Sequence, residues 1–191
     1  FRSNEFVAVL GPSGSGKTTI VRRLLERYPQ FEFSISATSR APRGQERDGV
    51  DYYFLSHGEF MQAVTENRFV EWEEVYEGTC YGTLRSEVER IWQRGHVIVF
   101  DVDVLGGINL KRIFGGDACS VFIMPPSVEE LRRRLEGRGT DAPEVIERRV
   151  AKAEFELTKA PEFDHIVLND RLEEAVERTC AILDAFIGQA E

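Results

Sequence analysis

Cysteine and long apolar runs are both scarce in this 191-residue sequence. The cysteines number three, Cys80, Cys119 and Cys180, and their odd number and wide spacing give no indication of a disulfide framework or a zinc site. This cysteine usage favours a reducing, cytoplasmic setting. The sequence has no apolar run of membrane-spanning length and no signal-peptide pattern. We therefore expect a cytoplasmic protein with no membrane partner.

Positively charged residues are outnumbered by negatively charged ones: the sequence has 24 Lys and Arg and 33 Asp and Glu, for a net charge of −9. This balance argues against a general nucleic-acid-binding role. An anionic substrate would need positive charge gathered at one place. The three histidines form no recognisable set and receive no role. Hydrophobic residues reach 42%, enough for a core, and the length suggests one domain over residues 1–191.

One glycine-rich stretch carries most of the chemical information. Gly11–Thr18 fits the pattern G-x-x-x-x-G-K-[ST] without a mismatch, between the apolar run Phe6–Leu10 and an amphipathic run. In this strand–loop–helix setting, glycines let backbone N–H groups point inward at a phosphate, and the helix N-terminus adds positive potential. Lys17 is placed to reach the β- and γ-phosphates of a nucleotide, and the Thr18 hydroxyl to ligate Mg²⁺.

Short apolar runs alternate with amphipathic runs along most of the chain. Strands are predicted near 5–10, 33–36, 97–101, 119–124 and 165–168, and helices near 17–27, 57–66, 84–94, 104–114, 128–136, 143–159 and 171–187. This alternation predicts an α/β fold with a parallel sheet covered by helices on both faces. Two capping-box patterns, Ser56-x-x-Glu59 and Ser127-x-x-Glu130, mark helix starts.

Two regions break the alternation. Residues 37–83 begin with an Arg- and Gly-rich loop and predict a small β-rich insertion beside the sheet. Residues 137–143, rich in Gly and Arg, predict a lid over a phosphate site, together with the start of the following helix. The core is then assigned to residues 1–36, 84–136 and 144–191.

Two arginines and two tyrosines of the insertion suit a phosphate monoester. Arg40 and Arg43 lie three residues apart in the loop, and Tyr52 and Tyr81 follow in loop-like sequence. Guanidinium forks and tyrosine hydroxyls are suited to phosphate oxygens. The alternative is a pair of solvated surface arginines.

Glu71 is a carboxylate inside an otherwise strand-like apolar pattern. Alternation places Glu71 on the same strand face as the apolar Phe69. A carboxylate there can accept two N–H bonds from the edge of guanine. The alternative is a solvated position on an edge strand.

Asp101 and Asp103 follow the strongly apolar run Val97–Phe100. Carboxylates at the carboxyl end of a parallel strand face the crevice where ligands bind, and there they support Mg²⁺ in P-loop enzymes. For Asp103 the alternative is capping of the next helix. Arg134, Arg138 and Arg149 lie in or beside the lid and are candidates for phosphate contacts.

Taken together, these motifs resemble the guanylate kinase family over about residues 4–187. The matching blocks are Gly11–Lys17, Ser36–Arg43, Asp51-Tyr52, Phe69–Trp72, Tyr81–Thr83, Asp101–Asp103, Pro125–Ser127, Leu135–Thr140 and Asn169-Asp170. The resemblance implies a P-loop NTPase-type fold with a core, a GMP-binding region and a lid. It implies transfer of the γ-phosphoryl group of ATP to GMP (and dGMP) with Mg²⁺, and closure of lid and insertion to exclude water.

The resemblance also implies a role for individual residues. It assigns the GMP phosphate to Arg40, Arg43, Tyr52 and Tyr81, and the guanine to Ser36, Glu71, Thr83 and Asp103. It assigns catalysis to Lys17, Arg138 and Arg149, and Mg²⁺ to Thr18 and Asp101. It assigns ATP binding to Gly11, Ser13, Gly14, Ser15, Gly16, Lys17, Thr18, Thr19, Arg134 and the neighbourhood of Asn169.

Two departures from the family pattern are visible. The segment Glu77–Gly82 is one residue longer than the usual turn and has Cys80 where a tyrosine is common. This difference bears on the placement of Tyr81 and Thr83. Leu105–Gly107 stands where the family often has Gln-Gly.

Three other functions fit parts of the sequence. Guanylate-kinase-like modules of scaffold proteins bind proteins instead of catalysing, but typically lack an intact phosphate loop and lid arginines. A GTPase would need an N-K-x-D motif, which the sequence lacks. A kinase for another monophosphate would not need Glu71 together with Ser36. The sequence leaves a monomer and a small homo-oligomer equally open.

Overall fold

Five parallel strands form the central sheet, in the order β2-β7-β1-β8-β9. Their bounds are Phe31–Phe33 (β2), Val97–Asp101 (β7), Phe6–Leu10 (β1), Ala118–Met124 (β8) and His165–Leu168 (β9). The computed structural model describes residues 6–137, 139 and 142–188, with residues 6–10 and 188 described by their backbone alone. Because every neighbouring pair is parallel, the carboxyl ends of the strands lie along one edge, where ligands bind in such sheets.

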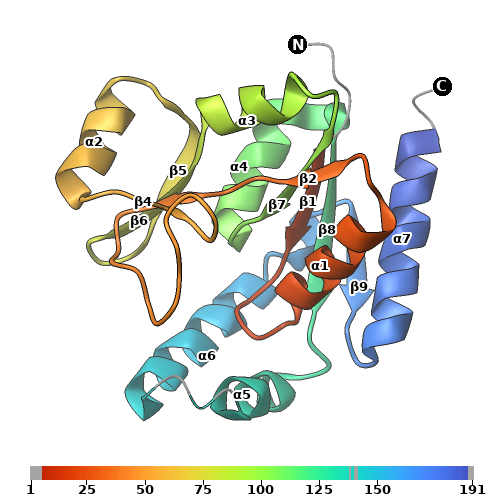
Figure 1. Cartoon of the computed structure of the whole chain (residues 1–191). Helices are drawn as coiled ribbons and strands as arrows, with labels where there is room; N and C mark the ends of the chain where they lie inside the picture. The colour runs from red at the N-terminus through yellow and green to blue at the C-terminus, as the bar shows by residue number, and fades with distance from the viewer. Residues whose placement is uncertain (1–5, 138, 140–141, 189–191) are drawn as a thin grey trace.

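Helices cover both faces of this sheet (Figure 1). Their bounds are Lys17–Arg27 (α1), Arg85–Trp92 (α3), Val104–Phe114 (α4) and Leu172–Gly188 (α7), with 3₁₀ turns at Gly115–Asp117 (η1) and Ala160–Glu162 (η2). Val97 and Val99 of β7 belong to the core shared with α1 and α7. Ile98 and Phe100 belong to the core of the opposite face, shared with α3 and α4. Burial on both faces explains why β7 is a continuous apolar run.

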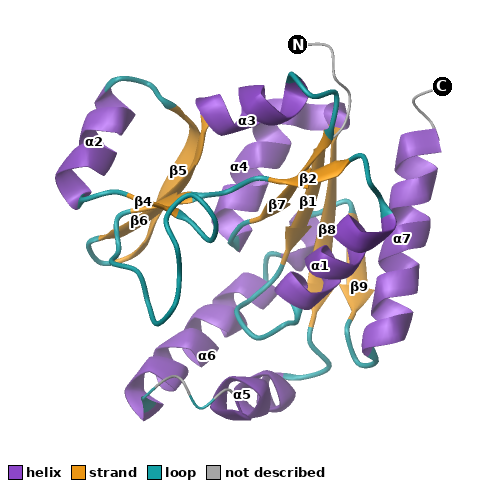
Figure 2. Cartoon of the chain, in the orientation of Figure 1, coloured by secondary structure: helices purple, strands orange, loops and turns teal. Residues whose placement is uncertain are grey.

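Residues 37–83 build a second, smaller sheet beside the first (Figure 2). Its order is β4-β3-β6-β5, with the bounds Ala37–Thr38 (β3), Tyr53–Phe54 (β4), Phe69–Tyr76 (β5) and Thr79–Leu84 (β6), and it carries helix α2 (His57–Thr65). Phe60 of α2 stacks on Phe69 of β5 with ring centroids 4.5 Å apart. Cys80 is buried in the same core. Tyr81 lies in β6 and not in a loop, so its side chain and that of Cys80 point to opposite faces of the sheet.

Helices α5 (Val128–Gly137) and α6 (Pro143–Leu157) pack against each other through Leu131, Leu135, Ile146 and Val150. In Figure 1 the pair lies beyond the end of the sheet at which β8 leads into α5. Most of the predicted lid separates the two helices, and residues 138, 140 and 141 lie outside the described part. Within the described residues, none of the helices is both long and apolar enough to cross a membrane.

The predicted α/β architecture is confirmed, and the predicted helices agree with the observed bounds to within two residues. The bounds of the strand predicted near 33–36 are wrong, because β2 runs from Phe31 to Phe33. Ser34 still donates its N–H to the Val99 carbonyl of β7, at 2.9 Å. The next amide, that of Ile35, points to the other side of the chain and donates to the Glu87 carboxylate at 3.0 Å.

The capping box at the start of α2 is confirmed. Ser56 accepts from the Glu59 amide at 3.2 Å, and the Glu59 carboxylate accepts from the Ser56 amide at 2.7 Å. At the start of α5, Ser127 accepts from the Glu130 amide at 3.1 Å. The carboxylate of Glu130 instead pairs with arginines of its own helix, including Arg134.

Candidate functional site

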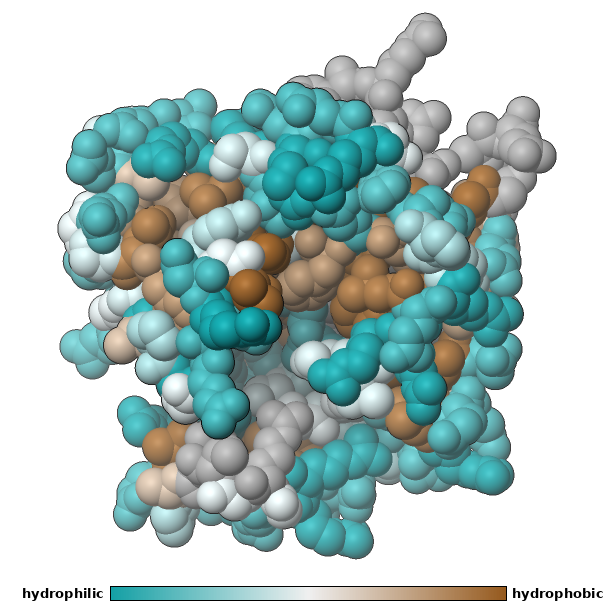
Figure 3. Space-filling model, in the orientation of Figure 1, coloured by the Kyte–Doolittle hydropathy of each residue, from teal (hydrophilic) through white to brown (hydrophobic). Residues whose placement is uncertain are grey.

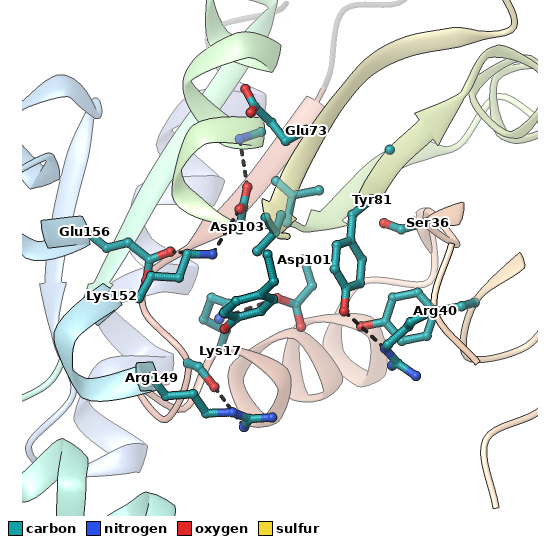
Figure 4. A pocket seen from close by; sticks show the side chains of 18 of the residues that line it. Lys17, Ser36, Arg40, Glu73, Tyr81, Asp101, Asp103, Arg149, Lys152 and Glu156 are labelled. Carbon is teal, nitrogen blue, oxygen red and sulfur yellow. Dashed lines mark hydrogen bonds and ion pairs between the residues drawn. The ribbon is translucent and has the colours of Figure 1, made fainter. Parts of the chain in front are cut away.

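A cavity of about 360 Å³ opens between the phosphate loop, the insertion and α6. In the close view of Figure 4, Arg40 and Tyr81 lie on one side of it, and Arg149 and Lys152 on the other. Figure 3 shows a hollowed face on which hydrophilic side chains predominate. The residues predicted from sequence that line the cavity are Gly11, Ser13, Lys17, Ser36, Arg40, Arg43, Tyr52, Glu71, Tyr81, Asp101, Asp103 and Arg149.

The loop between β1 and α1 has the backbone shape that its glycines permit. Gly11, Gly14 and Gly16 all have positive φ, at 143°, 91° and 98°. An ideal Cβ on Gly11 would lie 2.4 Å from the Ile123 carbonyl oxygen, so only glycine fits against β8. Among the described side chains, none caps the N-terminus of α1. The first amides of that helix therefore remain available to an anion.

Lys17, Thr18 and Asp101 meet where the loop faces the end of β7. The Lys17 ammonium lies 3.9 Å from Asp101 Oδ1 and 3.4 Å from the Pro12 carbonyl oxygen. The Thr18 hydroxyl donates to Asp101 Oδ2 at 3.0 Å. Lys17, Thr18 and Asp101 also line an adjoining hollow of about 170 Å³. In the described part of the chain, no group of three or more His, Cys, Asp or Glu could hold a metal by itself.

Asn169 and Arg134 support the loop from behind. Asn169 is 5% exposed, and its Nδ2 donates to the Ser15 carbonyl at 2.7 Å. Arg134 donates to the Asn169 carbonyl at 3.0 Å while pairing with Glu130. Both residues were predicted to bind ATP, and that contact stays a prediction. In the structure they hold the phosphate loop through the hydrogen bonds just given. Thr19 is exposed on the first turn of α1.

Gly16→Ala is expected to abolish ATP binding while leaving GMP binding nearly unchanged. The new Cβ would lie 2.3 Å from Asn169 Nδ2 and force a non-glycine residue into φ +98°. Isothermal titration with each nucleotide checks this. The matched control is Gly58→Ala on α2, where the added Cβ has nothing within 4 Å. Equal loss of both nucleotides would mean that the substitution unfolds the protein instead.

Arg40 is held on three sides inside the insertion. It donates to both carboxylate oxygens of Glu46 at 2.6 and 2.8 Å and to the Tyr81 hydroxyl at 3.1 Å, and its guanidinium lies 4.8 Å from the Tyr52 ring centroid. The Glu46 hydrogen bonds raise the pKa of Arg40, against an opposing effect of burial. Glu46 also accepts from the Arg43 amide at 2.7 Å. Arg40 is therefore not a solvated surface arginine.

Glu71 is a buried carboxylate, only 8% exposed, at the cavity wall. The solvated edge-strand alternative is therefore wrong. Burial raises the pKa of Glu71 to about 7, against the hydrogen bond from the Thr83 hydroxyl at 2.7 Å, and the nearby charge of Asp103 raises it further. An ideal Cβ on Gly106 would lie 3.2 Å from both Glu71 Oε2 and Asp103 Oδ1. Glycine at 106 thus lets α4 approach both carboxylates.

Asp103 uses its two oxygens differently. Oδ1 accepts from the Gly106 amide at 2.9 Å and caps α4, which confirms the capping alternative. Oδ2 faces the ammonium of Lys152 on α6, at 3.3 Å, and both residues line the cavity. Lys152 also pairs with Glu156 at 3.3 Å. Capping leaves the Oδ2 side of Asp103 toward the cavity, so a role toward the guanine stays a prediction.

Arg149 and Arg138 complete the predicted set. Arg149 Nη1 donates to the Ser13 hydroxyl at 3.4 Å, which brings α6 to the phosphate loop. Arg138 lies outside the described residues.

Sequence reasoning missed Glu46 and Lys152. Glu46 follows two arginines in a polar loop, and that clustering was the one local signal available. Lys152 looks like any charged position of an amphipathic helix, and only the fold brings it to Asp103.

The comparisons with known proteins agree on one family. The family model described as guanylate kinase matches residues 3–186. A guanylate kinase of Bacteroides fragilis is 54% identical over 177 residues, covering 93% of this chain and 87% of the relative. One of Salinibacter ruber is 49% identical over 184 residues, covering 96% and 97%. The crystal structure of guanylate kinase from Anaplasma phagocytophilum aligns with a TM-score of 0.77 at 31% identity, covering 95% of this chain and 85% of that one.

Proposed function

The chain belongs to the guanylate kinase family. From this premise we propose that the cavity binds ATP and GMP together and that the γ-phosphoryl group of ATP is transferred to GMP, giving ADP and GDP. The same site takes dGMP. The observation that carries the proposal is that one cavity is lined both by the phosphate-loop Lys17 and by the insertion residues Arg40 and Glu71. A donor site and an acceptor site therefore face each other across a short gap.

On the donor side, the phosphate loop and the start of α1 bind the ATP phosphates. Lys17 contacts the β- and γ-phosphates, and Arg149 and Arg138 approach from α6 and the lid. Arg134 and Asn169 lie behind the loop and border the adenine.

On the acceptor side, the GMP phosphate lies among Arg40, Arg43, Tyr52 and Tyr81. Arg40 is already fixed by Glu46, so its guanidinium loses little conformational freedom on binding. The guanine lies among Ser36, Glu71, Thr83 and Asp103. Glu71 accepts from the N1 and N2 hydrogens, and Thr83 holds Glu71 through its hydroxyl.

The reaction needs charge stabilisation more than proton transfer. A phosphate monoester has a second pKa of about 6, so the GMP oxygens are mostly ionised at neutral pH and attack without a general base. Lys17 and Arg149 offset the repulsion between the two polyanions and stabilise the transferring group. Closure of the insertion (residues 37–83) and the lid (137–143) keeps water from accepting the phosphoryl group.

Thr18 and Asp101 provide oxygen atoms that suit Mg²⁺. The two side chains lie within hydrogen-bond distance, at 3.0 Å, beside the loop that binds phosphates. With phosphate oxygens and water completing its shell, Mg²⁺ would neutralise charge on the ATP phosphates. The chemistry of these donors fits the ion.

Asp101→Asn is expected to raise the Mg²⁺ concentration for half-maximal rate by about tenfold, because it removes a carboxylate beside the ion, and even the loss of a residue that only supports the ligands costs about 10–100-fold in metal affinity. The rate is followed as ADP release at saturating nucleotides. A second readout is the Mg²⁺-dependent thermal protection of the protein by ATP, which should weaken in parallel. Asp117→Asn, exposed on η1, is the control. A lower kcat with an unchanged Mg²⁺ requirement would speak against the assignment.

The function is tested by ADP release from ATP with GMP, dGMP, AMP, CMP or UMP offered singly. GMP and dGMP are expected to support turnover and the other three to support very little. No turnover with any of them, together with retained fold, would instead favour a protein-interaction domain. Turnover with another monophosphate would identify a kinase of different specificity.

We further propose a cytoplasmic enzyme that works as a monomer or small homo-oligomer, with small-molecule substrates and no nucleic-acid or membrane partner. The three cysteines are buried thiols in the described structure, which suits a reducing compartment. Light scattering on a size-exclusion column tests the oligomeric state.

A further inference from the structure

A buried carboxylate outside the cavity ties the insertion to the core. Glu87, on the first turn of α3, is 2% exposed. Its Oε1 accepts from the Ile35 amide at 3.0 Å, and its Oε2 from the Tyr53 hydroxyl at 3.0 Å. Arg90 binds both oxygens, at 2.8 and 3.0 Å. The carboxylate is thus fully hydrogen-bonded, as a buried charge must be.

The hydrogen bonds of Glu87 link the two segments that connect the core to the insertion. Ile35 lies where the chain leaves the core, between β2 and β3. Glu87 itself lies where the chain returns, just after β6. Tyr53 belongs to β4, inside the insertion. One carboxylate therefore fixes the connection between β2 and β3, helix α3 and the insertion sheet relative to one another.

The immediate neighbours of these partners face the cavity. Ser36 follows Ile35, Tyr52 precedes Tyr53, and both Ser36 and Tyr52 line the cavity. The Tyr53 amide also donates to the Ser36 carbonyl at 2.9 Å, which closes a small ring of contacts with Glu87. A shift of the Glu87 carboxylate would move both neighbours at once.

Glu87 is anchored on the core side. Arg90 also pairs with Glu32 of β2, and Glu32 accepts from Arg94 at 3.0 Å and contacts His96 at 2.8 Å. Although burial opposes ionisation, the hydrogen bonds from Arg90, the Ile35 amide and Tyr53 lower the pKa of Glu87. It therefore stays charged at neutral pH and keeps all its partners.

We infer that Glu87 is a positioning residue for the acceptor nucleotide: it contacts no substrate, but holds Ser36 and Tyr52 at the distance from the phosphate loop that GMP requires. The inference rests on the proposed function, because it assumes that the insertion side of the cavity takes GMP. Ser36 and Tyr52 also border the hollow of Lys17, Thr18 and Asp101, but the hydrogen bonds of Glu87 go to the insertion and its connections, so the larger effect is expected on GMP.

Glu87→Gln tests the inference, with Tyr53→Phe as a milder second variant. Glutamine keeps the shape but offers one acceptor oxygen and an NH₂ group to donors on both sides. The KM for GMP is expected to rise about tenfold in Glu87→Gln and about threefold in Tyr53→Phe. The KM for ATP should stay within about twofold in both. Glu89→Gln, exposed on the same helix, is the matched control and should leave both KM values unchanged.

A merely structural role gives a different pattern. It would lower the melting temperature and the fraction of active enzyme, hence the apparent kcat, with both KM values unchanged. That result, or equal rises of both KM values, overturns the inference. If Glu87→Gln does not fold, Tyr53→Phe decides alone, because it removes one hydroxyl only. Absence of GMP-dependent turnover in the unaltered protein would instead refute the proposed function.

Discussion

Glu71→Ala is expected to lower kcat/KM for GMP by about 10²–10³-fold and to leave ATP binding nearly intact. A buried carboxylate that accepts two N–H bonds from guanine contributes strongly to binding, because charged hydrogen bonds are worth about 1.5–3 kcal/mol each. The same carboxylate would face the acceptor N1 of adenine without a donor, so AMP is expected to be a poor substrate. Loss of Glu71 therefore removes both affinity for GMP and discrimination against AMP.

Steady-state kinetics with GMP and AMP and titration calorimetry with ATP check this prediction. Glu77→Ala is the matched control, since Glu77 is exposed at the tip of the same hairpin. Equal losses of GMP and ATP binding would refute the assignment of Glu71 to the guanine.

Protonation of Glu71 adds a pH dependence with a definite sign. Burial raises the pKa of this carboxyl from 4.5 to about 7 in the folded protein. Only the ionised form accepts two hydrogen bonds, so the KM for GMP should fall as the pH rises through 7, beyond the change due to the GMP phosphate. Glu71→Gln should remove this part of the profile.

The raised pKa of Glu71 also affects stability. An acid whose pKa is raised on folding favours the folded state most below its unfolded pKa, near 4.5, and this contribution is lost as the pH rises to about 7. At pH 8 the ionised carboxylate then lowers the free energy of unfolding by up to about 3 kcal/mol. Glu71→Gln should melt at a higher temperature than the unaltered protein at pH 8, with the difference shrinking toward pH 5.

Local signals explain what could be predicted from sequence. The phosphate loop depends on glycines and on one lysine at fixed spacing, so Gly11–Thr18 was recognisable without any tertiary information. The α2 cap needs only Ser56 and Glu59, three residues apart. By contrast, the Ile35 amide, just after β2 ends at Phe33, bonds to Glu87, 52 residues away. No local pattern near residue 33 records that contact.

The partners of the charged residues in the cavity could not be predicted from sequence either, because those partners come together only in the folded chain. Arg40 and Arg43 are both visible as basic residues, but only the fold surrounds Arg40 with Glu46, Tyr52 and Tyr81, whereas Arg43 is exposed, as the solvated alternative expects. Lys152 on α6 and Asp103 at the cap of α4 meet only in the fold. In the described structure Arg40 pairs with Glu46, and Lys152 pairs with Asp103. Phosphate groups of the substrates would therefore compete with carboxylates, not with water alone.

Lys17→Met is expected to lower kcat by about 10³-fold or more while changing the KM for GMP little. The Lys17 ammonium lies between the Pro12 carbonyl and Asp101, partly shielded from solvent at 14% exposure of its side chain. In such a place a fixed positive charge stabilises developing charge on the transferring phosphoryl group far better than water does. Methionine keeps an unbranched side chain of nearly the same length and removes the charge and the N–H donors.

Whether Lys17→Met lowers kcat or raises the KM for ATP decides the role of Lys17. An interaction made only in the transition state lowers kcat and kcat/KM together, whereas uniform binding of ATP raises KM alone. Single-turnover rates with ATP and GMP, beside calorimetric ATP affinity, separate the two. Arg22→Met, exposed on the same helix, is the control for general loss of positive charge. Lys17→Arg should not restore the rate, because a planar guanidinium does not replace the compact ammonium that lies against the Pro12 carbonyl of the same loop. A variant that kept its kcat and lost only ATP affinity would reduce Lys17 to a binding residue and leave Arg149 and Arg138 to stabilise the transferring group.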